Sequence, residues 1–466
     1  MRNWSRFAAL CCLLAAPAAA QSPLVVLTSD FQTGSLALLE AGGGAPRTDL
    51  LTIHSDAVAR YHDGRVYVIN RLGQDNILVL DPAAPADPLL QFSVGNGSNP
   101  QDLEFASQRK AYVSRHNSAS LLLVDPRSGD SLGEIDLSAF ADADGLPEPA
   151  EMALVGDRLY VACQRLDRNA GWVASQSVLA VIDINTDQLV DWDSGQEGVQ
   201  GLALQIDNPG NLIGMGGKLY VGQTGQYGVA DGGVEMVDLA SGRSEGLVLG
   251  ESELGGDLTS FALVSAAKGY AVVSAPDFSN SVRPLDLATG KAGPALAGHS
   301  GGYTPDLEVD GGRLVVADQG TFSDPGSAGL LLYDTATDAL LAGPIAVGLP
   351  PVNIAVLGEG QTTAVSEERG SLPAQTYLGA AYPNPFNAST LIPLAVGAEA
   401  ATLDLTIYDA LGRRVRLLSG GRLAAGSHAF HWDGRDDKGQ AMGSGPYMVE
   451  LRMGAWRQTG KLLLLK

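Results

Sequence analysis

One pattern recurs seven times along this chain: a short apolar strand is followed by a second strand that closes on an acidic residue. The earlier strand of each pair ends at Val26, Val68, Val113, Val161, Val221, Val273 or Val316. The later strand closes at Glu40, Asp81, Asp125, Asp183, Asp238, Asp286 or Asp334. Six steps over the 294 residues from Glu40 to Asp334 give a mean repeat of 49 residues. Repeats of this length built from strands alone are typical of propeller blades, so the sequence predicts an all-β, seven-bladed β-propeller.

Each repeat is read as four strands, and the recurring pair supplies the second and third. In the second repeat these strands are 56–61, 65–70, 76–81 and 89–94. The seven predicted inner strands contain residues 56–59, 102–105, 151–154, 201–204, 260–263, 306–309 and 353–356. The chain enters the repeats on a second strand, 24–28, and leaves them on an inner strand, 351–357. We therefore expect a propeller over residues 21–357 whose last strand completes the first blade and removes two exposed edges.

The repeats resemble the YVTN/YncE-like and lactonase-like seven-bladed propellers. The resemblance lies in Leu-Tyr-Val at 159–161 and 219–221 and in Val-Ile-Asp at 181–183, and it covers residues 24–357. That superfamily contains binding proteins and a few enzymes, so the resemblance implies the fold and leaves both kinds of function open.

The first 20 residues have the pattern of a secretory signal. Arg2 and Arg6 precede an apolar stretch, 7–16, and Ala18 and Ala20 fit cleavage before Gln21. No later segment has the run of about 18 apolar residues that a spanning helix needs, so no transmembrane segment is expected in the mature chain. Cys163 is then the only cysteine of the mature chain, and its strand pattern predicts a buried, unreactive thiol.

The charge balance argues against two kinds of partner, both of them polyanionic. The chain has 30 basic and 52 acidic residues and a net charge of −22. Such a surface repels nucleic acid and anionic membranes, and it favours cations or simple solubility.

The character of the sequence changes after the propeller. Residues 358–376 are polar and read as a linker, and a second domain is expected over 377–466. Alternating apolar residues near 403–408, 429–432 and 447–451 predict a small immunoglobulin-like β-sandwich. Tyr-Pro-Asn-Pro-Phe-Asn at 382–387 and Trp-Asp-Gly-Arg-Asp-Asp-Lys-Gly at 432–439 resemble the FlgD-like Ig module of exported bacterial proteins, akin to type IX secretion sorting tails. The resemblance implies contact with export machinery and a place outside the cell or on the outer surface of a Gram-negative-type bacterium, with the periplasm as the alternative.

Loops that join second to third strands, and loops that join consecutive blades, gather on one face of a propeller. Aligned repeats place a set of polar residues at the mouth of the central channel, and these are the predicted ligand-binding residues: Asp56, Arg71, Asp102, Arg115, Glu151, Arg165, Asp306 and Asn353. The four carboxylates among them could hold a hard cation through oxygen ligands. They could equally cap strand-end amides or bind ordered water.

A second cation candidate is the acidic stretch 140–151. Asp142, Asp144 and Glu151 fall on the third, fifth and twelfth positions of a calcium loop, and Gly145 falls on the sixth. Phe140 at the first position and two prolines after the glycine break the template, so an ordinary acidic connecting loop is the alternative reading. The motif Gly-His-Ser-Gly-Gly at 298–302 matches Gly-x-Ser-x-Gly, but no strand-turn-helix context surrounds it, so we expect a loop.

These observations favour an exported, non-catalytic binding protein that is placed by its C-terminal module. The ligand is a protein, a glycan or a small molecule, and no cofactor is expected apart from the candidate Ca²⁺. The alternative is a lactonase-like hydrolase or lyase that uses a divalent cation in the channel. Such a site needs inward acidic, Asn and His ligands, and the predicted inner strands supply no histidine.

Overall fold

The computed structural model describes residues 21–193, 195–321 and 323–358 of the repeat region. In the C-terminal part it describes 376–378, 381, 386, 389–396, 401–409, 412–423, 426–454 and 456–464. The predicted signal 1–20, linker residues 359–375 and all of the 382–387 motif except Phe386 lie outside the described residues.

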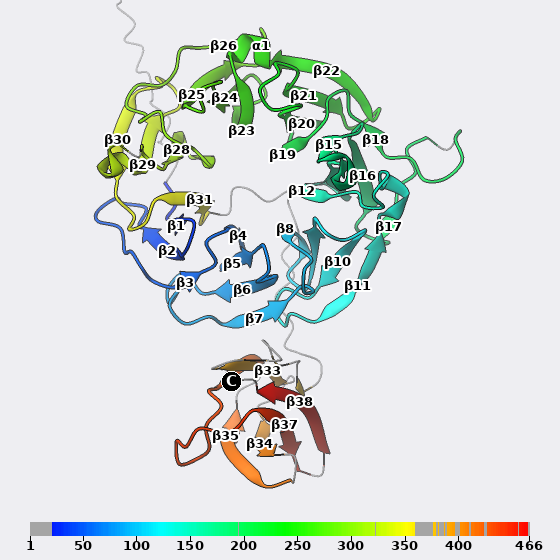
Figure 1. The fold of residues 1–466 in the computed structure, drawn as a ribbon, viewed down its shortest axis with the longest axis vertical. Helices are drawn as coiled ribbons and strands as arrows, with labels where there is room; N and C mark the ends of the chain where they lie inside the picture. Colours follow the sequence, from blue (N-terminus) through cyan, green and yellow to red (C-terminus); the bar gives the residue numbers. More distant parts are fainter. Residues whose placement is uncertain are drawn as a thin grey trace, which may run out of the picture.

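Seven antiparallel sheets form the repeat region, as predicted, and Figure 1 shows them as a ring of blades. From the inner to the outer strand, the first blade contains β31 (Pro351–Val356), β1 (Leu24–Ser29), β2 (Gly34–Leu39) and β3 (Thr52–Ile53). The second contains β4 (Ala57–His62), β5 (Arg65–Asn70), β6 (Asn76–Leu80) and β7 (Leu90–Ser93). The third contains β8 (Pro100–Ser107), β9 (Lys110–Arg115), β10 (Ser120–Val124) and β11 (Ser131–Asp136).

The remaining four blades repeat this order. The fourth contains β12 (Pro149–Val155), β13 (Arg158–Cys163), β16 (Val178–Asp183) and β17 (Gln188–Leu189), with β18 (Leu202–Ala203) also on β16. The fifth contains β19 (Pro209–Met215), β20 (Lys218–Gln223), β21 (Gly233–Asp238) and β22 (Arg243–Gly250). The sixth contains β23 (Asp257–Ser265), β24 (Lys268–Ser274), β25 (Asn280–Asp286) and β26 (Lys291–Ala292). The seventh contains β27 (Asp306–Asp310), β28 (Arg313–Asp318), β29 (Gly329–Asp334) and β30 (Leu340–Ile345).

The ring closes as the sequence predicts. β31 lies antiparallel to β1, with Leu24 opposite Val356 and Leu27 opposite Asn353 (Figure 1). Every residue of β1 is buried, because the strand has a partner on each side and a neighbouring blade on each face. The closure removes the two strand edges that an open array would expose.

One predicted inner strand is wrong. Residues 202–203 form β18, which pairs with β16 of the fourth blade, and the fifth inner strand is β19 instead. β17 and β18 each pair with one end of β16, so the outer strand of this blade is split in two. Leu202 and Leu204 are buried between the fourth and fifth blades. The alternation of apolar residues here therefore reflects burial between two blades, and it does not show that the segment is the inner strand of a blade.

The core lies between neighbouring blades. Each interface buries the apolar residues of two consecutive sheets, as in the cluster of Tyr67, Ile69, Phe92 and Phe105 between the second and third blades. A buried Leu, Ile or Phe side chain contributes about 1.5–3 kcal/mol. Between the strands lie a small hairpin of β14 (Leu166–Asp167) and β15 (Val173–Ala174) and the short helix α1 (Glu251–Leu254).

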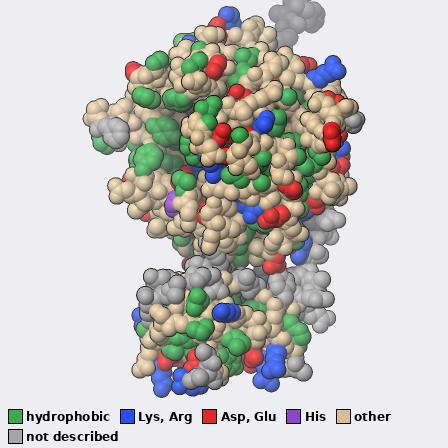
Figure 2. All heavy atoms as spheres, turned by 45° about the vertical axis from the view of Figure 1, so that its right-hand side comes forward, with side chains coloured by type: hydrophobic (Ala, Val, Ile, Leu, Met, Phe, Trp, Pro, Cys, Tyr) green, Lys and Arg blue, Asp and Glu red, His purple; other side chains and the backbone are tan. Residues whose placement is uncertain are grey.

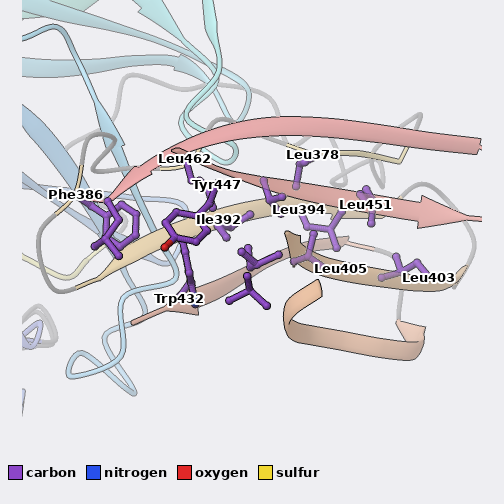
Figure 3. Close-up of a cluster of buried hydrophobic side chains, with 14 of the residues drawn as sticks. Leu378, Phe386, Ile392, Leu394, Leu403, Leu405, Trp432, Tyr447, Leu451 and Leu462 are labelled. Carbon is purple, nitrogen blue, oxygen red and sulfur yellow. The ribbon is translucent and has the colours of Figure 1, made fainter. Parts of the chain in front are cut away.

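Two sheets form the C-terminal sandwich. One contains β32 (Tyr377–Leu378), β33 (Thr390–Val396) and β36 (Gly426–Trp432). The other contains β35 (Arg414–Leu423), β34 (Ala401–Asp409), β37 (Gly445–Met453) and β38 (Trp456–Leu464). Figure 3 shows Phe386, Trp432 and Tyr447 close together at one end of the core. The ring centroid of Trp432 lies 5.4 Å from that of Phe386 and 4.9 Å from that of Tyr447. The predicted sandwich fold is confirmed, because apolar residues of both sheets fill one core.

Candidate binding face and central cluster

Polar side chains on the inner strands join consecutive blades. In four blades the inner strand carries an Asn or Asp directly before an apolar residue. The side chain of this Asn or Asp accepts a hydrogen bond from a backbone N–H on the inner strand of the next blade. The acceptor and donor pairs are Asn353 Oδ1 with Ala59 N (2.7 Å), Asp102 Oδ2 with Met152 N (2.9 Å), Asn211 Oδ1 with Phe261 N (3.3 Å), and Asp306 Oδ2 with Ile354 N (2.8 Å). Asp306 Oδ2 also accepts from Asn353 Nδ2 at 2.8 Å. Three predicted site residues (Asp102, Asp306 and Asn353) therefore hold the ring together.

Arg60 of β4 brings a positive charge to the same region. Its Nη2 lies 2.8 Å from Asp102 Oδ1 and 3.1 Å from Glu151 Oε2. Asp102 is fully buried, whereas solvent reaches part of the Arg60 and Glu151 side chains. A guanidinium with fixed donors suits two carboxylates on different strands.

Five carboxyl groups lie near enough to interact with the charge of this guanidinium, and with Arg60 they form what we call the central cluster: Asp102, Glu104, Glu151, Asp306 and Glu308. Burial, and after it the nearby charge of Asp102 or Asp306, raises the pKa of Glu104 and that of Glu308 to about 8. Burial also raises the pKa of Glu151 to about 7 and that of Asp306 to about 6, although Arg60 acts in the opposite direction. Near neutral pH the cluster therefore holds protons as well as negative charge.

The predicted alignment of Asp56 is wrong by two residues. Ala59 N takes the hydrogen bond that Met152 N takes in the fourth blade, so Val58 occupies the position that corresponds to Asp102. Asp56 lies before β4 and pairs with Arg71, whose Nε is 2.9 Å from Asp56 Oδ1. The two predicted residues are thus brought together at the mouth of the ring.

Two other predicted residues point elsewhere. Arg115 is buried within the third blade, where its Nη2 lies 2.9 Å from Glu134 Oε1 of β11. Arg165 donates from Nη1 to Gln176 O at 2.6 Å, inside the loop between β13 and β16. Neither contact belongs to the central cluster.

The predicted cation loop contains three converging carboxylates, but their third member differs from the prediction. Asp142, Asp144 and Glu148 offer oxygen atoms that all lie within 4.8 Å of one another. Glu151, the predicted third ligand, instead faces Arg60 in the central cluster. The calcium-loop template counted twelve positions, whereas the chain turns into β12 at Pro149 and places Glu151 on an inner strand.

The Gly-x-Ser-x-Gly motif lies in the loop between β26 and β27. The Ser300 hydroxyl donates to Asp318 Oδ1, and Asp318 Oδ2 accepts the Ser300 N–H at 2.8 Å. The serine thus fixes a loop. Cys163 is buried, and burial raises its pKa to about 12, so the thiol stays protonated.

Sequence reasoning missed Arg60, Glu104 and Glu308. The signal was present, because Asp-Leu-Glu occurs at both 102–104 and 306–308 and the period of two places both acids on one side of the strand.

Exposed apolar side chains gather on one face of the propeller, and sequence reasoning missed them too. Strands alternate in direction, so loops joining second to third strands and loops joining consecutive blades share one face, here called the loop face. Eight exposed large apolar residues of the described propeller lie in these loops: Phe31, Leu72, Trp172, Val173, Tyr227, Val229, Phe278 and Tyr303. Tyr227 and Phe278 stack with ring centroids 6.4 Å apart.

Tyr303 connects this apolar rim to the mouth of the ring. Partial desolvation of its hydroxyl raises the pKa of Tyr303, and Arg71 lies near enough to oppose that shift. Isolated aromatic residues in glycine-rich loops carry no periodic signal, which is why the sequence pattern did not reveal the rim.

The opposite face is built from tight turns. Asp238 Oδ1 accepts the Ser241 N–H at 2.7 Å, and Asp286 and Asp334 make equivalent bonds. Figure 2 shows acidic, basic and hydrophobic side chains interspersed over one side of the molecule, so the negative charge is not gathered into one patch there. Within the described ranges, no helix is both long enough and apolar enough to cross a membrane.

Comparisons with known proteins agree with the two folds. Residues 386–454 match the FlgD Ig-like domain family. A putative 6-phosphogluconolactonase from Bacteroides fragilis is similar at 14% identity and a TM-score of 0.51, covering 73% of this chain and 99% of that one. A second, from Bacteroides uniformis, is similar at 12% identity and a TM-score of 0.50, covering 72% and 99%.

A longer structure also matches: PorZ, a surface component of the type IX secretion system of Porphyromonas gingivalis, at 13% identity and a TM-score of 0.46. The match covers 94% of this chain and 64% of PorZ, so this chain spans less than two thirds of that protein. No curated protein matches. Identities this low show a shared fold alone. The chain is a seven-bladed β-propeller followed by a FlgD Ig-like domain.

Proposed function

We propose that this chain is an exported, non-catalytic binding protein whose loop face holds the ligand. The observation that carries the proposal is the apolar rim. Phe278 is 74% exposed, Phe31 68% and Trp172 55%, and they belong to different blades. Soluble proteins rarely gather exposed apolar side chains around one site unless a partner covers them.

The spread of the rim favours a protein as the ligand. The eight residues come from five blades and one connection between blades, so a small molecule or a single sugar would touch few of them. Aromatic anchors separated by polar loops are typical of protein interfaces. A glycan or a small molecule remains the weaker reading.

The C-terminal module supports a location outside the cytoplasm. Its match to the FlgD Ig-like family and its resemblance to sorting tails support a role in export or attachment, and so does the secretory-signal pattern of residues 1–20. We place the protein outside the cell or on the outer surface, with the periplasm as the alternative. A chain that lacks residues 377–466 should be mislocalised in fractionated cells. Normal placement of that chain would contradict the sorting role.

The loop face is tested by substitution in the full chain. Wild type, a Tyr227→Ser/Phe278→Ser variant and a Leu340→Ser/Leu341→Ser control are produced in the native host and cross-linked. The control removes exposed apolar residues from the outer strand β30. We expect partners that the wild type and the control share and the loop-face variant loses. Identical partners for all three chains would overturn the proposal.

The alternative of a hydrolase or lyase with a cation in the channel is less well supported. Arg60 already lies between Asp102 and Glu151 and supplies the positive charge that a metal ion would supply there. A tightly held, stoichiometric divalent ion that disappears in Glu151→Gln would favour the alternative.

A further inference from the structure

The connection between β11 and β12 contains a small group of carboxylates outside the central cluster. Asp142, Asp144 and Glu148 come from seven consecutive residues, and their oxygen atoms lie within 4.8 Å of one another. The group is not solvated like an ordinary acidic loop, because Glu148 is fully buried and Asp142 and Asp144 are half-buried.

Two oxygen atoms of this group are buried and accept no hydrogen bond. Glu148 Oε2 accepts the Leu166 N–H at 3.1 Å, but Glu148 Oε1 accepts none, and Asp142 Oδ2 accepts none either. A buried polar atom without a hydrogen bond costs about 1–3 kcal/mol, and more when it carries charge. A bound cation would take these two oxygens, which have no hydrogen bond, as ligands.

Arg168 is the cation nearest to the group, and its side chain makes ion-pair contacts with two of the carboxylates but no hydrogen bond to them. Its Nε lies 3.3 Å from Glu148 Oε1 and 3.8 Å from Asp144 Oδ2 without forming a hydrogen bond. Its Nη2 instead donates to His116 O at 3.0 Å and to Asn117 Oδ1 at 2.9 Å. One guanidinium beside three carboxylates leaves two negative charges uncompensated when all three are ionised.

We propose that Asp142, Asp144 and Glu148 form a binding site for one Ca²⁺ ion. The donors are all carboxylate oxygens, which are hard ligands, and the group contains no His or Cys that would favour zinc. Ca²⁺ takes six to eight oxygens in flexible geometry, so carboxylates bound through one or both oxygens, together with waters, complete its shell. Mg²⁺ demands a near-ideal octahedron, which a short irregular loop does not offer.

A Ca²⁺ ion at this site would stabilise the loop between β13 and β16, which belongs to the loop face. The importance of that loop for binding rests on the proposed function. Asp144 Oδ2 accepts the Arg168 N–H at 3.1 Å, so two of the ligands also hold the loop between β13 and β16. That loop carries Trp172, whose ring lies 5.1 Å from the Arg168 guanidinium. Bound Ca²⁺ would fix the two carboxylates that accept these hydrogen bonds, and it would thereby order the loop that carries a rim residue.

The test uses the full chain stripped with a chelator and titrated with CaCl₂ alone by calorimetry and by thermal unfolding. We expect one Ca²⁺ per chain and a rise in melting temperature for the wild type. Glu148→Gln and Asp142→Asn each keep the side-chain shape, and each should weaken binding at least about tenfold. Glu308→Gln, which changes the central cluster instead, should bind like the wild type.

No Ca²⁺ binding by the folded wild type at millimolar concentration would overturn the site, and so would unchanged binding in both loop variants. Loss of binding in Glu308→Gln alone would place the ion in the central cluster and overturn it as well. Because the titrant is the metal alone, the result does not depend on whether the loop face binds a protein.

Discussion

Arg60 of the second blade donates a hydrogen bond to Glu151 of the fourth blade, 3.1 Å away, while pairing with Asp102 of the third. One guanidinium thus spans three consecutive blades at the centre of the ring. The inner strands of the seven blades line the centre of the ring, so the charges that they carry are held close together. The centre of this propeller therefore depends on electrostatics as well as on apolar packing between blades.

Replacing Arg60 should destabilise the propeller strongly. Arg60→Met leaves the fully buried Asp102 and its neighbours without their counter-charge, and breaking a buried pair in this way costs about 3–5 kcal/mol. Denaturant unfolding measures the loss. Arg243→Met, at an exposed position of β22, is the control and should change the free energy of unfolding little. Equal stability of the two variants would show that the central pair contributes nothing.

The central cluster should make stability fall as pH rises. The pKa values of Glu104 and Glu308 are raised by burial from 4.5 to about 8, so between these values the folded state binds more protons than the unfolded state. Stability from these groups is present below about pH 4.5 and is lost as pH rises towards 8. Glu104→Gln/Glu308→Gln should flatten the slope measured by unfolding from pH 5 to 8. Glu197→Gln, an exposed control, should leave the slope unchanged.

The fold could be predicted because its signals are local and repeated. Tyr-Val strands and acidic turns recur in each blade, and the phase of the repeat alone implies that β31 pairs with β1. The errors occur where a pattern has two physical causes. Residues 201–204 show the alternation of apolar side chains expected of an inner strand, because Leu202 and Leu204 are buried. Residues 202–203 nevertheless pair with β16 on the outer side of the fourth blade.

The site was predicted less well because its members depend on register and on side-chain direction. Asp56 and Asp102 look equivalent in sequence, but the hydrogen bond to Ala59 shows that Val58 is the equivalent residue. Arg115 ends β9 next to the loop face, but its side chain points into its own blade and pairs with Glu134. Neither outcome follows from spacing, since both are decided by which partner satisfies a buried polar group.

Asn353 should be the residue through which ring closure is most easily weakened. Asn353→Leu removes an acceptor from the Ala59 N–H and a donor from Asp306, and each unsatisfied buried group costs about 1–3 kcal/mol. Thermal unfolding should show a lower melting temperature. Asn169→Leu, at an exposed loop position, is the matched control and should unfold like the wild type.

Two tyrosines fasten neighbouring blades in the same way. Tyr112 donates to Asp187 Oδ1, and Tyr270 donates to Asp338 Oδ1 at 2.6 Å, each across a blade interface. Tyr→Phe at either position leaves a half-buried aspartate oxygen with one partner fewer and should cost about 1 kcal/mol. The double variant should lose the sum, because the two interfaces share no residue. Tyr160→Phe is the control, since the hydroxyl of Tyr160 makes no hydrogen bond within the described residues. If Tyr160→Phe lowers the free energy of unfolding as much as Tyr112→Phe does, the packing of the ring and not the hydroxyl is responsible.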